Sequence, residues 1–154
     1  MFHKINEITM SNNKDIKIIS ENRLSLDSIP DAVFDLPNLE RLHICNSHIK
    51  TIPDSIARLT KLKELYLNEN QLTKIESNLL RNLSDLEVLF IRSNKIDEIK
   101  EDSFDDLKKL KDLNLRNNQL SEFKANRLLK NSPNLGSVIL FNNNLDPKII
   151  SYYN

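Results

Sequence analysis

The chain has 154 residues, of which 39% are hydrophobic and 29% are charged, and its 22 basic and 22 acidic side chains give a formal net charge of zero. This length suits one domain, and this composition predicts a folded protein rather than a disordered one. A balanced charge argues against a strongly basic surface for nucleic acid or anionic membrane, so neither is expected as a partner. No stretch approaches the ~20 apolar residues of a membrane-spanning helix.

The N-terminal residues 1–13 contain no apolar run of the length that a secretory signal needs, and we expect them to be loose. The chain contains one cysteine, Cys45, which excludes an intramolecular disulfide and indicates a reducing compartment. Asn82-Leu83-Ser84 matches a glycosylation sequon, which we interpret as an unmodified turn. These features predict a cytoplasmic protein, or one that is delivered elsewhere by a route that needs no signal peptide.

Residues 14–38 are predicted to form a degenerate repeat that caps the N-terminal end of the core. The apolar side chains of this segment are Ile16, Ile19, Leu24 and Leu26. Its register is open by two residues. Alignment of Ile29-Pro30 with the later Ile-Pro pair makes Leu26 equivalent to Ile49, whereas alignment on Asn22 gives that place to Leu24.

Residues 39–145 contain five copies of an eleven-residue pattern that is apolar at positions 1, 4, 6 and 11 and usually Asn at position 9. The copies begin at Leu39, Leu62, Leu86, Leu110 and Leu135, so they are 23 to 25 residues apart. Such a period predicts a solenoid of stacked repeats that share one core. Position 9 holds Asn70, Asn94, Asn118 and Asn143, with Ser47 as the exception. We expect these amides to bond the backbone between neighbouring repeats, with a less complete set of bonds at Ser47.

The segments between the copies return the chain to the next strand. Their apolar residues, such as Ile52 and Ile56 or Ile75 and Leu80, are three to five residues apart. This spacing predicts short helical or 3₁₀ turns rather than strands, with Pro30 and Pro53 as turn or first helical positions.

Residues 146–154 are predicted to form a C-terminal cap. Asp146-Pro147 is typical of the start of a short helix. We expect this helix to lay Ile149, Ile150 and Tyr152 over the last repeat.

The Leu-x-x-Leu-x-Leu-x-x-Asn-x-Leu pattern at this period resembles the leucine-rich repeat family. The resemblance implies an α/β fold: one domain over residues 1–154, built as a right-handed solenoid with a parallel concave β-sheet and short helical, 3₁₀ or irregular convex segments. It also implies a non-catalytic module that binds a protein partner, with no cofactor. The Ile-Pro segments resemble bacterial and intracellular subtypes, and by analogy we expect a bacterial effector that engages host proteins. Such an effector would be secreted by a signal-peptide-independent route into a host cell.

Strand alternation places positions 3, 5 and 7 of the pattern on the concave face, away from the core. Aromatic side chains at His43, Tyr66 and Phe90 would form one stripe there, and nothing in the fold requires them at an outward position. Interface cores favour Tyr, Phe and Arg, so this stripe is the predicted partner-binding site. The other candidate contact residues are Glu64, Arg92, Asn114, Arg116, Ile139 and Phe141, the last two of which the C-terminal tail is expected to approach. In the alternative interpretation, the aromatic residues only stabilise the sheet through cross-strand contacts.

Two other classes of function stay open. The first is a structural protein that associates with itself, although we expect a monomer. The second is a small metal or Cys-His site that uses His43 and Cys45, with His48 close in sequence. Residues two apart on a strand are about 6.5–7 Å apart, which is too far for a direct bond without side-chain reach, so we predict no catalytic residue and no metal ligand.

Overall fold

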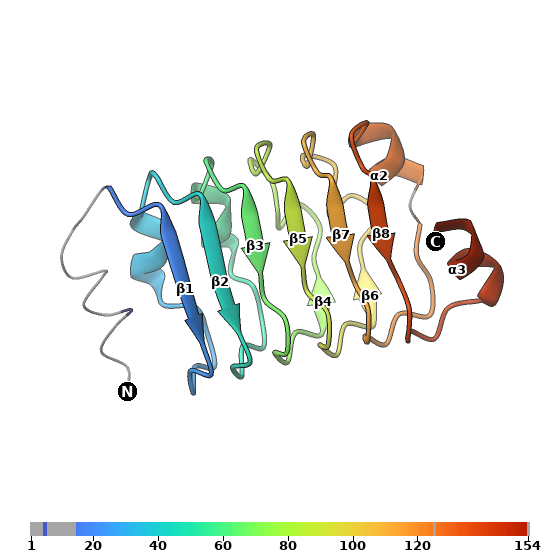
Figure 1. The fold of residues 1–154 in the computed structure, drawn as a ribbon, viewed down its shortest axis with the longest axis horizontal. Helices are drawn as coiled ribbons and strands as arrows, with labels where there is room; N and C mark the ends of the chain where they lie inside the picture. Colours follow the sequence, from blue (N-terminus) through green and yellow to red (C-terminus); the bar gives the residue numbers. More distant parts are fainter. Residues whose placement is uncertain (1–4, 6–14, 125, 154) are drawn as a thin grey trace.

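The computed structural model describes residue 5 and residues 15–124 and 126–153, and the side chains of residues 151–153 lie outside this description. Six parallel strands form one sheet and follow one another in chain order (Figure 1). They are β1 (Ile18–Asn22), β2 (Arg41–Cys45), β3 (Glu64–Tyr66), β5 (Val88–Phe90), β7 (Asp112–Asn114) and β8 (Ser137–Ile139). This arrangement confirms the predicted solenoid with a parallel sheet.

The strands pair in the register of the eleven-residue pattern. Leu42 pairs with Leu65, Leu65 with Leu89 and Leu89 with Leu113, so position 4 lies opposite position 4 throughout. In the five copies that begin at Leu39, the side chains at positions 4 and 6 are all buried in the core. Burying a leucine or isoleucine side chain stabilises the fold by roughly 1.5–3 kcal/mol relative to exposing it, so each repeat adds several such contributions to one continuous core.

The first strand settles the register of the N-terminal repeat. Ile19 of β1 pairs with Leu42 of β2. The carbonyl oxygen of Leu26 accepts the His48 N–H at 3.0 Å, just as the carbonyl of Ile49 accepts the N–H of Gln71 one repeat later. Leu26 is therefore the equivalent of Ile49. Of residues 1–13, only Ile5 lies within the described part, and it is buried against the core.

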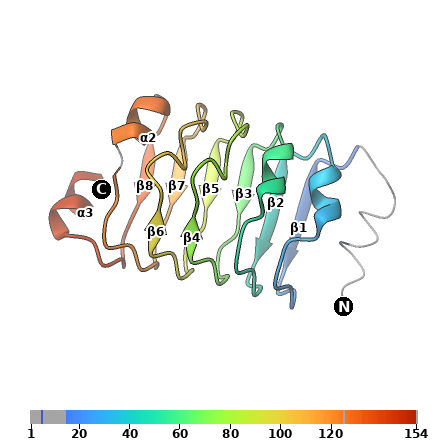
Figure 2. The ribbon, with the colours of Figure 1, turned by 180° about the vertical axis from the view of Figure 1, so that it is seen from behind.

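The return segments form a second layer behind the sheet (Figure 2). The first two contain the 3₁₀ helices η1 (Asp31–Asp35) and η2 (Asp54–Arg58), which begin directly after Pro30 and Pro53 as expected. The next two contain the short strands β4 (Lys74–Ile75) and β6 (Glu98–Ile99), which pair in parallel. The prediction of turns rather than strands is therefore wrong for these four residues. It holds for the residues that follow, where Arg81 N–H donates to the Asn78 carbonyl at 3.1 Å and Asp105 N–H to the Asp102 carbonyl at 3.2 Å. The repeats that contain β4 and β6 have the same length, so their return segments stack in register and form hydrogen bonds between their backbones.

Two short α-helices lie near the C-terminal end. Helix α2 (Asn126–Asn131) forms the return segment before β8, and α3 (Pro147–Tyr153) follows the last repeat. As predicted, Asp146 caps α3, because its Oδ1 accepts the N–H of Lys148 at 2.8 Å. Ile149 and Ile150 pack against the core, whereas the predicted contact of Tyr152 lies outside the described side chains.

The Asn column ties successive repeats together through the backbone. The Oδ1 of Asn94 accepts the N–H of Leu72 at 3.0 Å, and its Nδ2 donates to the carbonyls of Leu67 (2.9 Å) and Ile91 (3.0 Å). Asn70, Asn118 and Asn143 repeat this pattern. Ser47 makes a reduced set in the first full repeat, since its hydroxyl accepts from Leu24 N–H and donates to the Cys45 carbonyl.

Position 8 of the pattern has a conformation that we did not predict. At this position φ lies between 51° and 59°, in the left-handed region, in all six repeats of the described chain. The residues are Arg23, Asn46, Glu69, Ser93, Asn117 and Asn142. Asn tolerates this region better than most other residues with a side chain, so Arg23, Glu69 and Ser93 carry local strain.

Candidate functional site

The side of the six-stranded sheet that faces away from the core carries positions 3, 5 and 7, and we call it the open face. It corresponds to the concave face of the sequence analysis. The parallel register aligns position 5 across the sheet, so that His43 lies beside Tyr66, Tyr66 beside Phe90, and Phe90 beside Asn114. Ile139 follows Asn114. The structure thus brings the predicted position-5 residues into one row.

Three rings of this row, which we call the aromatic row, are in direct contact. The ring centroids of His43 and Tyr66 are 4.2 Å apart at an interplanar angle of 62°, and those of Tyr66 and Phe90 are 5.0 Å apart at 64°. Such edge-to-face pairs contribute about 0.5–1.5 kcal/mol each beyond the burial of their area. The cross-strand stabilisation of the alternative interpretation is therefore present. All three residues are nevertheless only partly buried, so the row also offers aromatic surface to solvent.

Glu64 holds two neighbours on the position-3 side of the row. Its carboxylate lies 3.0 Å from Nε of Arg41 and 3.4 Å from Nε2 of His43. The contact with His43 lacks hydrogen-bond alignment, and Nε2 is buried with no hydrogen-bond partner among the described residues. Burial, together with the charges of Glu64 and Asp112, raises the pKa of Tyr66 above its usual value, so its phenol stays neutral.

The position-7 side carries two arginines with different surroundings. Arg92 lies 3.0 Å from the carboxylate of Glu69, and its backbone N–H donates to Asn68. Arg116 is exposed, and its guanidinium makes no ion pair with any residue that the structure describes. Arg92 is thus partly neutralised, whereas Arg116 presents a free positive charge.

The remaining predicted contact residues differ in exposure. Asn114 is buried, with 9% of its surface exposed, because its side chain turns back to accept the N–H of Arg116 at 3.1 Å. Asn114 therefore offers little surface to a partner, although strand alternation predicts that its side chain points outward. Phe141 is 48% exposed, so the expected cover by the C-terminal tail is not formed there, and Ile139 is partly buried.

Cys45 and His43 lie on the same face but have different environments. Burial is the main cause that raises the pKa of the Cys45 thiol, which disfavours the thiolate that a nucleophile or a metal ligand requires. His43 contacts Tyr66 and Glu64 instead. Within the described residues, no group of three or more His, Cys, Asp or Glu side chains is arranged to hold a metal ion.

A ladder of alternating charges, which we did not predict, runs along the start of the strands at position 2. Glu40 lies 3.5 Å from Lys17 and 2.7 Å from Lys63, and Glu87 lies 2.6 Å from Lys111. Hydrogen bonds from these lysines lower the pKa of both glutamates below their ordinary value. Three lysines face two glutamates, which leaves a net charge of only +1, so this edge supplies little net attraction for a charged partner.

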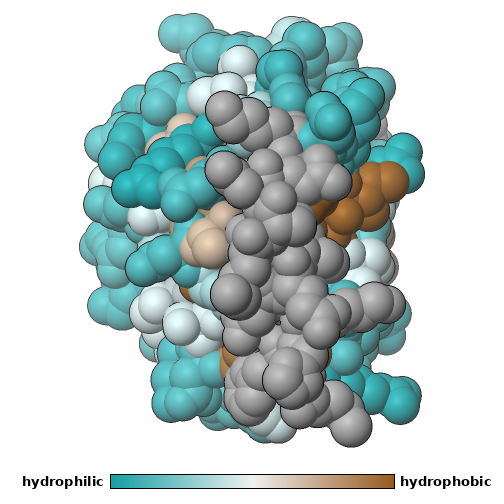
Figure 3. Space-filling model, turned by 90° about the vertical axis from the view of Figure 1, so that its left-hand side faces the viewer, coloured by the Kyte–Doolittle hydropathy of each residue, from teal (hydrophilic) through white to brown (hydrophobic). Residues whose placement is uncertain are grey.

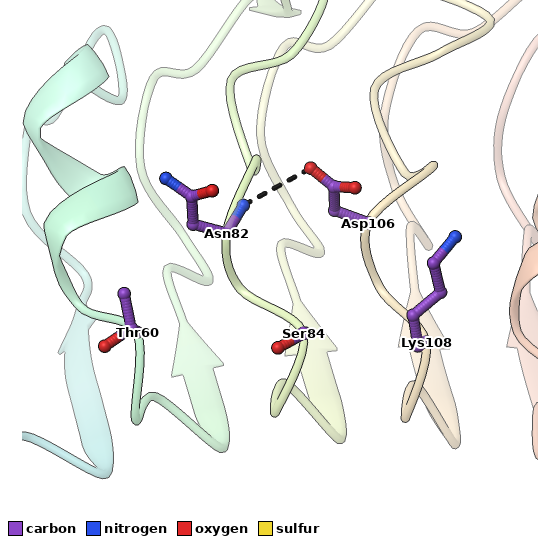
Figure 4. Close-up of a pocket in the computed structure, with 5 residues that line it drawn as sticks. All are labelled: Thr60, Asn82, Ser84, Asp106 and Lys108. Carbon is purple, nitrogen blue, oxygen red and sulfur yellow. Dashed lines mark hydrogen bonds between the residues drawn. The ribbon is translucent and has the colours of Figure 1, made fainter.

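The return side of the described chain carries two shallow hollows that are open and polar, one beside η2 and the other next to it along the solenoid. The second of these is drawn in Figure 4. Thr60, Asn82, Ser84, Asp106 and Lys108 line it, and the backbone N–H of Asn82 donates to Asp106 at 3.3 Å (Figure 4). Among the described residues, no helix is long and apolar enough to cross a membrane. The open face is therefore the better candidate for a binding surface.

Comparisons with known proteins agree with this architecture. A model of the leucine-rich repeat matches residues 18–72, 60–120 and 87–145. Over 91 residues the chain is 33% identical to roco10, a probable inactive serine/threonine-protein kinase of Dictyostelium discoideum, and over 74 residues it is 39% identical to human podocan-like protein 1. These matches cover 54% and 45% of this chain but 3% and 13% of the two relatives.

Two solved structures have the same fold. A leucine-rich repeat protein of Leptospira interrogans superposes with a TM-score of 0.82 at 30% identity, over 92% of this chain and 35% of that one. A chain of the TLR13–ssRNA13 complex superposes with a TM-score of 0.80 at 25% identity, over 88% of this chain and 19% of that one. This chain thus spans a minor part of each relative. With the repeat model covering most of its length and six strands stacked in its register, the chain belongs to the leucine-rich repeat family.

Proposed function

We propose that the protein is a non-catalytic module that binds a protein partner on its open face. The observation that carries this proposal is the aromatic row of His43, Tyr66 and Phe90, which crosses three strands and remains partly exposed. Contiguous exposed apolar surface tends to mark interaction sites, and aromatic residues dominate the energies of interface centres.

The fold supports the proposal through rigidity. The rings project from paired strands and contact one another edge to face, so binding orders few side chains. Less entropy is lost on association when a surface is ordered in advance. Leucine-rich repeats generally mediate protein–protein interaction, which agrees with this role.

A protein fits this face better than a nucleic acid does. One structural relative comes from a complex with ssRNA13, but the net charge of the present chain is zero. On the open face, Arg41 and Arg92 are paired with Glu64 and Glu69. Since nucleic-acid affinity depends largely on neutralising phosphates with free basic side chains, RNA is not part of the proposal.

Replacing Tyr66 and Phe90 with alanine tests the site. We expect the Tyr66→Ala/Phe90→Ala double variant to lose at least tenfold in affinity for a captured partner, because truncating interface hot spots costs about 2 kcal/mol or more each. Affinity capture followed by calorimetric titration with the captured protein measures the loss. Circular dichroism checks that the variant is folded.

Leu129→Ala is the matched control, since Leu129 is an apolar residue that is 40% exposed but belongs to α2, outside the open face. This control should bind as the wild type does. Full affinity in the folded double variant would refute the open-face site and direct attention to the return side or the chain ends.

The finer hypothesis of a bacterial effector that acts on host proteins stays a prediction. The relatives come from a bacterium, an amoeba and a human, so they favour no single source. A secretion assay, combined with capture from host and bacterial lysates, tests both the effector role and the expected compartment.

Self-association is a second candidate function. Strand β1 is the first strand of the sheet, and Ile18 at its start is 52% exposed. Figure 3 shows a hydrophobic patch at this end of the molecule. Light scattering across concentration separates the two functions: a mass that stays monomeric contradicts self-association, whereas a dimer that Ile18→Lys dissociates supports it.

A further inference from the structure

Asp112 at the start of β7 and Arg116, two residues after its end, have no ion-pair partner among the described residues. Among the described residues at positions 3, 5 and 7 of the six strands, Arg41 and His43 lie beside Glu64, and Arg92 is paired with Glu69. Asp112 and Arg116 have no such neighbour. Burying an unpaired charge is costly, so a partner that covers both residues needs a complementary charge at each.

The two charges flank the Phe90 end of the aromatic row. Asp112 lies at position 3 beside Val88, and Arg116 lies at position 7, four residues further along the same stretch of chain. At about 3.3 Å per residue, their Cα atoms are roughly 13 Å apart. Between them lies the apolar surface of Phe90 and Ile139, which stand on either side of the buried Asn114.

An extended segment that lies along β7 matches this spacing. Its side chains at i, i+2 and i+4 point to one side and cover about 13 Å. The outer two would then face Asp112 and Arg116, and the middle one would reach the apolar surface.

We propose that the occupant of the open face is an extended segment of a partner protein in which a basic and an acidic residue, four positions apart, flank an apolar residue midway between them. The basic side chain contacts Asp112, the acidic one contacts Arg116, and the apolar one packs against Phe90 and Ile139. This inference depends on the proposed function, because it specifies the partner of the same face.

A displayed library of random twelve-residue peptides, selected against the intact folded protein, tests the inference. The wild type should select a basic and an acidic residue at i and i+4 with an apolar residue at i+2, in either chain direction. Asp112→Lys should select two acidic residues at the outer positions, and Arg116→Glu should select two basic ones. Each single reversal gives residues 112 and 116 the same sign of charge. The expected consensus is therefore the same for both directions in which the peptide can bind.

Binding of one selected peptide gives a quantitative measure. Each charge reversal should lower the affinity for the peptide selected by the wild type roughly five- to tenfold, because an attraction at an exposed site becomes a repulsion. The controls are Glu122→Lys and Lys124→Glu, which make the same charge changes at exposed residues of a return segment. These variants should keep the wild-type consensus and affinity.

The outcomes separate the two proposals. A wild-type consensus that is apolar but lacks the flanking charges, and that depends on Tyr66 and Phe90, overturns the charge pattern and leaves the proposed function standing. A spacing of about nine residues, as a helix needs to cover 13 Å, overturns the extended conformation. Failure of the folded protein to enrich any peptide, or enrichment that the Tyr66→Ala/Phe90→Ala variant retains, contradicts both.

Discussion

At the scale of single residues, the turn after each strand depends on position 8 as much as on position 9. The left-handed conformation recurs at position 8 in every described repeat. Three of these positions hold Asn, and the other three hold Arg, Glu and Ser. Because Asn holds position 8 in only three of these six repeats, residue type does not mark the conformation, and the sequence pattern predicts only the role of position 9. The conformation follows from the backbone path, which the side chain either tolerates or opposes.

Ser93→Asn should stabilise the protein by roughly 0.5–1 kcal/mol, since Asn is less strained at positive φ. Ser93 has φ 55°, and its Oγ already accepts from Nδ2 of Asn117. The side-chain oxygen of an Asn at residue 93 can accept the same hydrogen bond, just as Oδ1 of Asn117 accepts from Nδ2 of Asn142 at 2.8 Å. The midpoint of urea unfolding measures the change. Ser121→Asn, at an exposed position outside the left-handed set, should leave the midpoint unchanged; a lower midpoint for Ser93→Asn would contradict the assignment of strain.

The candidate site shows which residues alternation can place. Strand alternation correctly assigned Tyr66 and Phe90 to the side of the sheet away from the core, because side chains along a strand point to the same side at every second residue. It could not predict that Asn114, equally outward by count, is buried by its own bond to the backbone of Arg116. It also could not show that Arg92 is paired while Arg116 is free, because that depends on the neighbouring turn.

At the scale of elements, the Asn column holds the repeats in register. Each amide satisfies one N–H and at least one carbonyl of the preceding repeat, so its loss leaves several buried groups without partners. The pattern predicted this column, but it could not predict which return segments become 3₁₀ helices and which become strands. That choice depends on whether neighbouring segments stack in register, as β4 and β6 do.

Asn94→Ala should destabilise the protein by roughly 2–4 kcal/mol, because the N–H of Leu72 and the carbonyl of Leu67 lose their partner. Ser47→Ala should cost less, since Ser47 makes a single bond in each direction. Chemical unfolding of both variants under the same conditions measures the difference. Equal losses would contradict the view that the amides bond the repeats more strongly than Ser47 does.

The charge ladder stops at Gly136, which occupies position 2 of the last repeat. A Cβ at this residue would lie 3.8 Å from the nearest heavy atom, the carbonyl oxygen of Lys111, so a side chain fits. Gly136→Ala should stabilise the protein by roughly 0.5–1 kcal/mol through the lower entropy of the unfolded chain. Gly136→Glu should add a contact with Lys111 that weakens as salt is raised. Unfolding at low and high salt measures both contributions, and a Glu effect that equals the Ala effect at low salt would contradict an extension of the ladder.

At the scale of the whole molecule, the repeats made the fold predictable because every copy solves the same packing problem. Once positions 4 and 6 were assigned to the core, the parallel sheet and the composition of its open face followed. The two ends of the chain were harder to predict, because the terminal repeats depart from the pattern. The register of β1 became definite only through the pairing of Ile19 with Leu42.

The central claim is that the open face binds a protein segment. The most direct test is to titrate the uniformly ¹⁵N-labelled protein with a library-selected peptide and to map the amide shift changes by NMR. We predict that the largest changes fall on β3, β5 and β7, at Tyr66, Phe90 and Asp112 above all. Changes confined to η2 and the return segments around Asn82 and Asp106, with an unaffected sheet, would contradict it.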